Sequence, residues 1–161
     1  MDDTVIHIAV TATPLDPMVE HGALMGRDAA SGAVVTFVGL MRDSNVGDAV
    51  TAMTLEHYPG MTENALREIA DEAQRRWPLQ VVRIVHRVGD LLPGDPIVFV
   101  GVSSAHRGEA FSACEFLMDY LKTRAPFWKR ETLQDGRQRW VDARASDSDA
   151  AARWYGDALL D

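Results

Sequence analysis

The sequence predicts an α+β fold in which a mixed, mostly antiparallel sheet packs against three to four helices. Short β-rich segments alternate with turn residues, and two longer segments repeat apolar residues at helical spacing. The links between strands are short and hairpin-like, unlike the long crossovers of regular strand–helix–strand units. A chain of 161 residues fits one domain, and we expect residues 1–161 to form it.

The first third of the chain predicts three strands separated by one mixed segment and one polar loop. The strand segments are rich in β-branched residues, and the polar loop carries the turn residues Gly47 and Asp48. We expect strands at residues 5–10, 32–41 and 50–57, and a helix within residues 15–30.

The clearest helix covers residues 59–77, where apolar side chains recur along one face and Glu and Arg fill the other. The apolar positions are Leu66, Ile69, Ala70, Ala73 and Trp77. Two strands follow, at residues 80–89 and 96–104, and the segment DLLPGD between them predicts a turn.

A second long helix is expected from about His106 to Thr123, with Ser104 as its capping residue. It must end before Pro126, because proline disfavours helical geometry at the preceding residue. Beyond it the sequence predicts a strand at 127–133, a turn, a strand at 139–144 and a terminal helix over about 146–160.

Composition excludes several functional classes. A formal charge of −8 argues against a nucleic-acid-binding protein, whose surface is usually basic. No apolar run approaches the roughly 18 residues of a membrane span, and the first residues lack the basic start of a signal peptide, so we expect a cytoplasmic protein.

No cofactor is expected from the motifs. One cysteine cannot form a thiolate metal cluster, and the five histidines show no metal-binding spacing. The glycine-rich phosphate fingerprints of nucleotide-binding proteins are absent. The sequence therefore predicts neither a metal site nor a nucleotide cofactor.

The usage of cationic residues is unusual. Fourteen of the sixteen are arginine, and the only lysines are Lys122 and Lys129. Lysine is an amine that can act as acid, base or nucleophile, whereas arginine stays charged. Three simpler explanations remain open: an arginine-biased genome, a lysine at a helix end for Lys122, and a surface ion pair with Glu131 for Lys129.

The neighbourhood of the lysines favours a site for an anionic small molecule. Seven of the sixteen cations fall within residues 122–144 of this acidic protein. His106 and Arg107 stand at a predicted helix start, which favours anions, and Arg42 follows a predicted strand. Cys114 lies within an apolar helical stripe that also holds Ala110, Phe111, Leu117, Met118 and Leu121, so we expect it in the core.

Several ordered motifs together resemble the catalytic (large) subunit of molybdopterin synthase. They are GAVVTFVGLMRDSNVGDAV, MTLEHYPGMTENAL, HRVGDLLPGD, VFVGVSSAHRGEAF, DYLKTRAPFWKRE and DGRQRWV. The resemblance covers roughly residues 30–145, and an ordered set of motifs is more specific than a single fingerprint.

The resemblance implies an activity and a partner. Enzymes of this family convert cyclic pyranopterin monophosphate into the dithiolene of molybdopterin, and a small ubiquitin-like subunit ending in Gly-Gly brings the sulfur as a thiocarboxylate. By motif, Lys122 and Lys129 are the expected catalytic residues. The expected substrate-binding residues are Leu40, Met41, Arg42, His106, Arg107, Arg130, Glu131 and Arg144.

The family also forms a heterotetramer built on a homodimer of large subunits, and the predicted helix agrees with this. Arg107 and Lys122 are fifteen residues apart in it, about 22 Å along the axis. Each pocket would then take its lysines from one chain and His106 and Arg107 from the other, unless the helix breaks near Gly108. Two rival functions remain: a lysine-dependent Schiff-base lyase or aldolase acting on a phosphorylated small molecule, and a non-catalytic partner-binding module.

Overall fold

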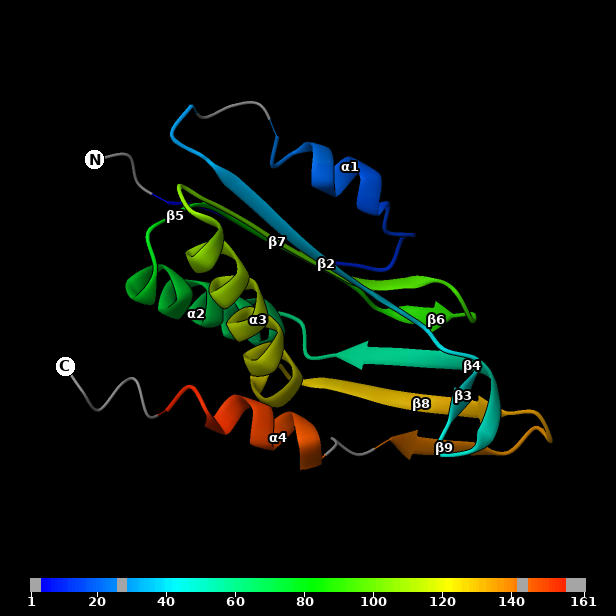
Figure 1. Cartoon of the computed structure of the whole chain (residues 1–161). Helices are drawn as coiled ribbons and strands as arrows, with labels where there is room; N and C mark the ends of the chain where they lie inside the picture. The colour runs from blue at the N-terminus through cyan, green and yellow to red at the C-terminus, as the bar shows by residue number, and fades with distance from the viewer. Residues whose placement is uncertain (1–3, 26–28, 142–144, 156–161) are drawn as a thin grey trace.

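The chain folds into two β-sheets that meet near the end of a long helix (Figure 1). The structure is a computed structural model, and it describes residues 4–25, 29–141 and 145–155. The α+β class predicted from the sequence is confirmed, and so is the mostly antiparallel strand arrangement.

The first sheet has four strands and is covered by helices on both faces (Figure 1). Strand β1 is parallel to β5, and the two other pairs are antiparallel. Helices α2 and α3 cover one face, and the short helix α1 covers the other. The strand order across this sheet is β1 (Val5–Thr11), β5 (Leu79–Arg87), β7 (Pro96–Ser104) and β2 (Ala33–Leu40). The three helices that cover it are α1 (Pro17–Gly22), α2 (Met61–Arg76) and α3 (Arg107–Arg124).

The second sheet is antiparallel throughout. Its long central strand β4 pairs with β8 along most of its length and with the short strand β6 on its other side. The order is β3 (Ser44–Asn45), β4 (Asp48–His57), β8 (Phe127–Leu133) and β9 (Gln138–Val141), with β6 (Gly89–Leu91) beside β4.

The main core lies between the first sheet and helices α2 and α3. Leu66 and Phe116 of the helices and Ile84 and Val100 of the sheet are fully buried in it. Each such side chain contributes about 1.5–3 kcal/mol relative to an exposed position. The spacing of apolar residues in 59–77 therefore predicted the buried face of α2 correctly.

Helix α4 (Ala145–Ala152) and the residues after it are attached to α3. Asp119 of α3 accepts hydrogen bonds from Trp154 Nε1 at 2.7 Å and from Arg153 at 2.8 Å. The Trp154 ring also packs edge-on against Trp77 and Phe116. These contacts hold α4 beside the end of α3 that faces the second sheet (Figure 1).

Several sequence predictions need correction. Ser104 does not cap α3, because it belongs to β7 and its hydroxyl donates to the carbonyl of Pro78 at 2.8 Å; His106 occupies the cap position without a side-chain bond. The helix expected within 15–30 spans only Pro17–Gly22. The expected turn after residue 89 begins as strand β6, because Gly89–Leu91 pair with β4.

The apolar stripe of α3 is also rotated from the prediction. Ala110, Cys114, Leu117 and Leu121 are buried as expected, but Phe111 is 62% exposed. Residues 142–144, the end of the predicted strand 139–144, lie outside the described residues. No helix in the described part of the chain is long and apolar enough to cross a membrane.

Candidate active site

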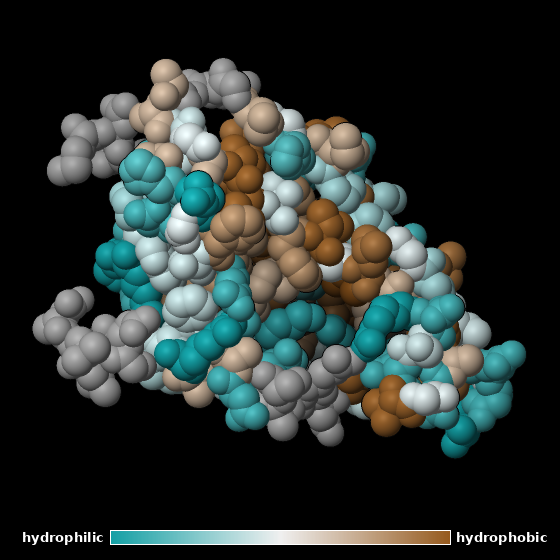
Figure 2. Space-filling model, viewed as in Figure 1, coloured by the Kyte–Doolittle hydropathy of each residue, from teal (hydrophilic) through white to brown (hydrophobic). Residues whose placement is uncertain are grey.

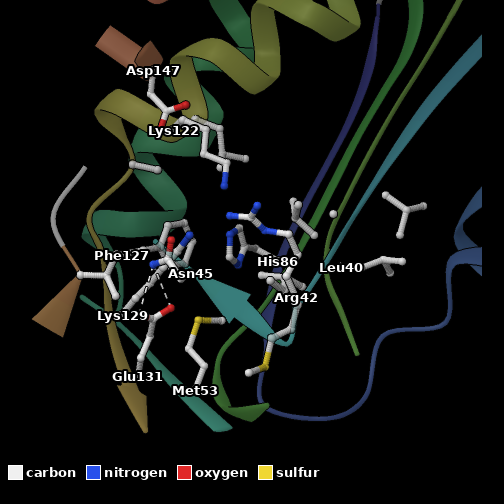
Figure 3. Close-up of a pocket in the computed structure, with 18 of the residues that line it drawn as sticks. Leu40, Arg42, Asn45, Met53, His86, Lys122, Phe127, Lys129, Glu131 and Asp147 are labelled. Carbon is white, nitrogen blue, oxygen red and sulfur yellow. Dashed lines mark hydrogen bonds between the residues drawn. The ribbon is translucent and has the colours of Figure 1, made fainter. Parts of the chain in front are cut away.

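A cavity of about 560 Å³ opens where the two sheets meet the C-terminal end of α3. Its wall includes the end of β2, the short strand β3, the end of β5, the last turn of α3 and one face of β8. Figure 2 shows the molecule from the same side as Figure 1: apolar residues gather at the centre of the visible surface, and hydrophilic residues lie over the second sheet. Figure 3 shows the polar side chains that converge on the cavity.

Lys122 reaches the cavity from the last turn of α3. The helix ends directly afterwards, because Pro126 forces Ala125 into extended geometry (φ −79°, ψ 128°). The chain then enters β8, so residues 122 and 129 lie on two different elements that border one space.

Strand β8 presents alternate side chains to the cavity. Phe127, Lys129 and Glu131 line it, as the two-residue period predicts. Trp128 and Arg130 belong to the other face of the strand: Trp128 is 45% exposed, and the Arg130 guanidinium lies 5.9 Å from the centre of the Trp140 ring. Arg130 therefore does not line the cavity, although its sequence neighbours Lys129 and Glu131 do.

Glu131 is a buried carboxylate held by neighbouring donors. The residue is 6% exposed, and its carboxylate accepts hydrogen bonds from Asn45 Nδ2 at 3.2 and 3.1 Å and from Arg139 Nε at 3.1 Å. Arg139 also donates to Asp48 at 2.8 Å. A buried carboxylate requires such partners, so these bonds fix the ionised group at the cavity wall.

Three of the predicted residues line the cavity at the last position of β2 and the two positions after it: Leu40, Met41 and Arg42. The pairing register shifts between Gly39 and Leu40, and the backbone of Met41 bonds to Asp95 at 2.9 Å and Gly94 at 2.8 Å. Met41 is buried, whereas Leu40 is 55% exposed at the rim. Figure 3 shows the Arg42 side chain directed into the same space as Lys122 and Lys129.

Two further predicted residues lie at the other end of α3. His106 and Arg107 are exposed at the N-terminal end of α3. They are not among the residues that line the cavity in the part of the chain that the structure describes. Arg144 lies outside the described residues. The structure thus brings together Leu40, Met41, Arg42, Lys122, Lys129 and Glu131.

Asn45 and His86 are polar lining residues that were not predicted from the sequence. Asn45 belongs to β3, in a segment whose sequence predicts only a polar loop, and its role depends on contact with Glu131, 86 positions away. His86 was detectable in the strand segment VVRIVHR as a polar ring on the face that it shares with Val82 and Ile84. Burial lowers its pKa to about 3, so the ring is neutral at physiological pH.

Cys114 lies in the main core, as predicted. It is 5% exposed, and its Sγ donates to the carbonyl of Val100 at 3.9 Å. Burial raises the pKa of the thiol to about 12, so it is not a thiolate at neutral pH. The one cysteine of the chain is therefore unsuited to carry sulfur.

Comparison with known proteins identifies the family. The model of the family described as MoaE protein matches residues 10–124. The chain belongs to the MoaE family. A relative named molybdopterin synthase catalytic subunit, from Escherichia coli, is 60% identical over 147 residues, which is 91% of this chain and 97% of the relative.

Two solved structures share the fold. One, described as the molybdopterin biosynthesis MoaE protein from Burkholderia ambifaria, is 55% identical with a TM-score of 0.76, and the match covers 92% of this chain and 97% of that one. Another is a complex of subunits 1 and 2 of the molybdopterin-converting factor from Helicobacter pylori. At 19% identity it shares the fold alone, with a TM-score of 0.63 and coverage of 88% and 91%.

The MoaE family match includes Arg42, His106, Arg107 and Lys122 but stops before β8. The E. coli alignment is longer than the family match, at 147 residues. The motifs that suggested the resemblance therefore extend beyond the family model, into the strand that carries Lys129 and Glu131.

Proposed function

We propose that this chain is the catalytic subunit of a molybdopterin synthase. In this proposal it transfers sulfur from the C-terminal thiocarboxylate of a small ubiquitin-like partner to cyclic pyranopterin monophosphate, which forms the dithiolene of molybdopterin. Membership of the MoaE family and the name of the E. coli relative support this assignment.

The observation that carries the proposal is the position of the two lysines. Lys122 and Lys129 come from different elements and border one cavity, while the single cysteine is buried away from it. An enzyme with this arrangement must receive sulfur from outside its own chain. A partner that presents sulfur on its C-terminal tail meets this requirement.

Charge and shape suit both incoming groups. Arg42, Lys122 and Lys129 offer cationic donors for the substrate phosphate and for the carboxyl group left on the partner tail. The exposed side chains of Phe37 and Leu40, both on the cavity wall, offer apolar contact to the tail.

The lysines supply the proton transfers in this mechanism. The thiocarboxylate sulfur bonds to a substrate carbon while an oxygen leaves that carbon as water, which requires a proton and produces a thioester between the tail and the substrate. Hydrolysis of the acyl–sulfur bond then leaves the sulfur on the substrate and a carboxylate on the tail, and it requires removal of a proton from water. A lysine amine serves either step, and it can also capture a carbonyl group transiently. Arginine cannot do so near neutral pH.

We also propose that the active assembly contains two copies of this chain, with one partner subunit on each. His106 and Arg107 favour anions at the N-terminal end of α3, yet they lie at the opposite end of that helix from Lys122. A two-fold dimer would bring them to the pocket of the other copy. The E. coli relative is named a catalytic subunit, which implies a further subunit and supports the heteromeric part of this assembly.

Reconstitution tests the proposed reaction. The purified chain is mixed with cyclic pyranopterin monophosphate and with a thiocarboxylated partner, and dithiolene product is measured. The matched control is the same partner ending in an ordinary carboxylate, which should yield no product. Absence of product with the thiocarboxylate in a folded complex would refute the proposal.

Borohydride treatment during turnover separates the proposed reaction from the lyase alternative. A Schiff-base lyase or aldolase must leave a reduced adduct of a phosphorylated substrate on Lys122 or Lys129 without any sulfur donor. Mass spectrometry detects such an adduct directly. A non-catalytic binding module would bind the partner and form no product in either experiment.

A further inference from the structure

His86 has no role in the reaction described so far, although it belongs to the cavity wall. It lies in β5, opposite Val98 of β7 and Val10 of β1, and is only 4% exposed. Its ring stacks on Phe127 of β8, with centres 3.8 Å apart and planes inclined by 19°. The stack joins the two sheets and fixes the orientation of the imidazole.

One hydrogen bond determines the tautomer of this ring. His86 Nδ1 lies 2.8 Å from the carbonyl oxygen of Arg87, and a carbonyl oxygen can only accept. Nδ1 therefore carries the hydrogen. In a neutral ring Nε2 then presents a lone pair, which makes it a hydrogen-bond acceptor.

The surroundings keep the ring neutral. Burial contributes most to lowering the pKa of His86, the bond to Arg87 opposes this effect, and the charges of Lys122, Lys129 and His57 add to it. At physiological pH the ring accepts at Nε2 and adds no charge to the cavity. Nor is it a useful general base, because a nitrogen with a pKa of about 3 has too little affinity for a proton to remove one from water or an amine near pH 7.

A neutral acceptor complements the rest of the wall. Ammonium and guanidinium groups such as those of Lys122, Lys129 and Arg42 are donors only and suit phosphate or carboxylate oxygens. Glu131 already accepts hydrogen bonds from Asn45 and Arg139. Asp147, on the other side of the cavity, is a carboxylate and favours cations. A ligand that carries both an anionic group and ring N–H groups needs a neutral acceptor for its N–H groups, in addition to cationic donors for its anion.

We propose that His86 is a specificity-determining residue whose Nε2 accepts a hydrogen bond from a ring N–H or amino group of the pterin. The inference rests on the proposed function, since it assumes a pterin phosphate in this cavity. The cationic side chains would bind the phosphate, and His86 would distinguish a nitrogen heterocycle that donates from one that does not. An unsatisfied buried acceptor penalises ligands without the donor.

Two substitutions separate this role from simple packing. His86→Phe keeps a flat ring to stack on Phe127 but removes the acceptor. His86→Gln removes the ring but can place a neutral carbonyl oxygen near the position of Nε2. A binding role predicts that Gln is better tolerated than Phe, and a packing role predicts the reverse order.

The experiment measures equilibrium binding of cyclic pyranopterin monophosphate and, separately, of inorganic phosphate to the full chain and both variants. We expect His86→Phe to weaken pterin phosphate binding about tenfold or more while phosphate binding stays unchanged. His86→Gln should lie closer to the wild type. Thermal melts of each variant establish that it is folded.

A spectroscopic readout accompanies the binding curves. In protein labelled with ¹⁵N-histidine, the Nε2 signal of His86, assigned by its loss in His86→Gln, should shift when pterin phosphate is added and not when inorganic phosphate is added. A packing role would not produce this difference.

The outcomes distinguish two kinds of failure. If the wild type does not bind pterin phosphate, the proposed function fails and this inference fails with it. If the wild type binds but folded His86→Phe binds as tightly, or binds better than His86→Gln, only the inference about His86 is overturned. An Nε2 signal that does not respond to bound pterin phosphate would overturn it as well.

Discussion

Arg107 and Lys122 lie at opposite ends of one unbroken helix, α3. Fifteen residues at 1.5 Å of rise place their Cα atoms about 22 Å apart along the axis. The helix continues through Gly108, so no break shortens this distance. Lys122 lines the cavity and Arg107 is exposed away from it. If both residues serve one substrate, they must come from two copies of the chain.

Mixing two inactive variants tests this arrangement. Lys122→Ala and Arg107→Ala are combined under conditions that exchange subunits, and product formation is measured. A mixed dimer would hold one pocket free of either substitution. Because half of the dimers are mixed at equal concentrations, activity should recover to about a quarter of the wild-type value.

A matched control uses Lys122→Ala with Lys129→Ala. Both lysines come from the same chain in the proposed pocket, so their mixed dimers contain no intact site and should stay inactive. If the first mixture also stays inactive after exchange has been demonstrated, each pocket is built from one chain.

The lysines themselves should be essential for turnover. We expect Lys122→Ala and Lys129→Ala each to lower kcat by about 100-fold or more, the usual effect of losing a positioned acid or base. Lys122 is exposed, so its substitution should change the unfolding free energy by no more than about 0.5 kcal/mol. Stopped assays and urea denaturation measure the two effects separately.

Arginine at either position is the informative comparison, because it preserves charge but keeps its proton. Lys122→Arg and Lys129→Arg should stay inactive while they still bind the substrate phosphate. Product formation at the wild-type rate by Lys129→Arg would exclude a proton-transfer role for that residue.

Cys114 should be dispensable for sulfur transfer. It is buried among apolar side chains, and its thiol is protonated at neutral pH because burial raises its pKa. Cys114→Ala should retain turnover and lose about 1 kcal/mol of stability through the lost packing. Thermal melts and product assays check both expectations, and a persulfide or thioester trapped on Cys114 during turnover would contradict them.

Local patterns in the sequence predicted the elements that carry the lysines. The period of two placed Lys129 and Glu131 on one face of β8, and Pro126 marked the end of α3 beside Lys122. Such features depend on neighbours a few positions away. Residue spacing is sufficient for them because backbone geometry fixes which side chains share a face.

These local patterns could not predict contacts between residues that lie far apart in the sequence. Ser104 looked like a helix cap, but its hydroxyl bonds to Pro78, which only the packing of β5 and β7 brings near. Asn45 and His86 acquire their positions from Glu131 and Phe127, which lie far away in sequence. Their place at the cavity follows from the meeting of the two sheets.

The stability of the protein should depend on pH through His86. Its pKa is about 3 in the folded chain, below the ordinary value of 6.5, because the ring is buried near Lys122, Lys129 and His57. As pH falls below about 6.5, the unfolded chain binds a proton at this position before the folded chain does. The unfolding free energy then decreases by up to about 1.4 kcal/mol per pH unit, and above that pH the effect is absent.

Urea denaturation of the wild type and of two variants at pH 7 and pH 5 isolates this contribution. His86→Phe and His86→Gln both lack an ionisable group, so each should lose less stability between these pH values than the wild type, by about 2 kcal/mol at most. Their absolute stabilities will differ, because only Phe preserves the stack on Phe127. Agreement between their pH dependences therefore assigns the effect to ionisation and not to packing. If the wild type and both variants lose the same stability over this range, His86 does not have a lowered pKa in the folded protein.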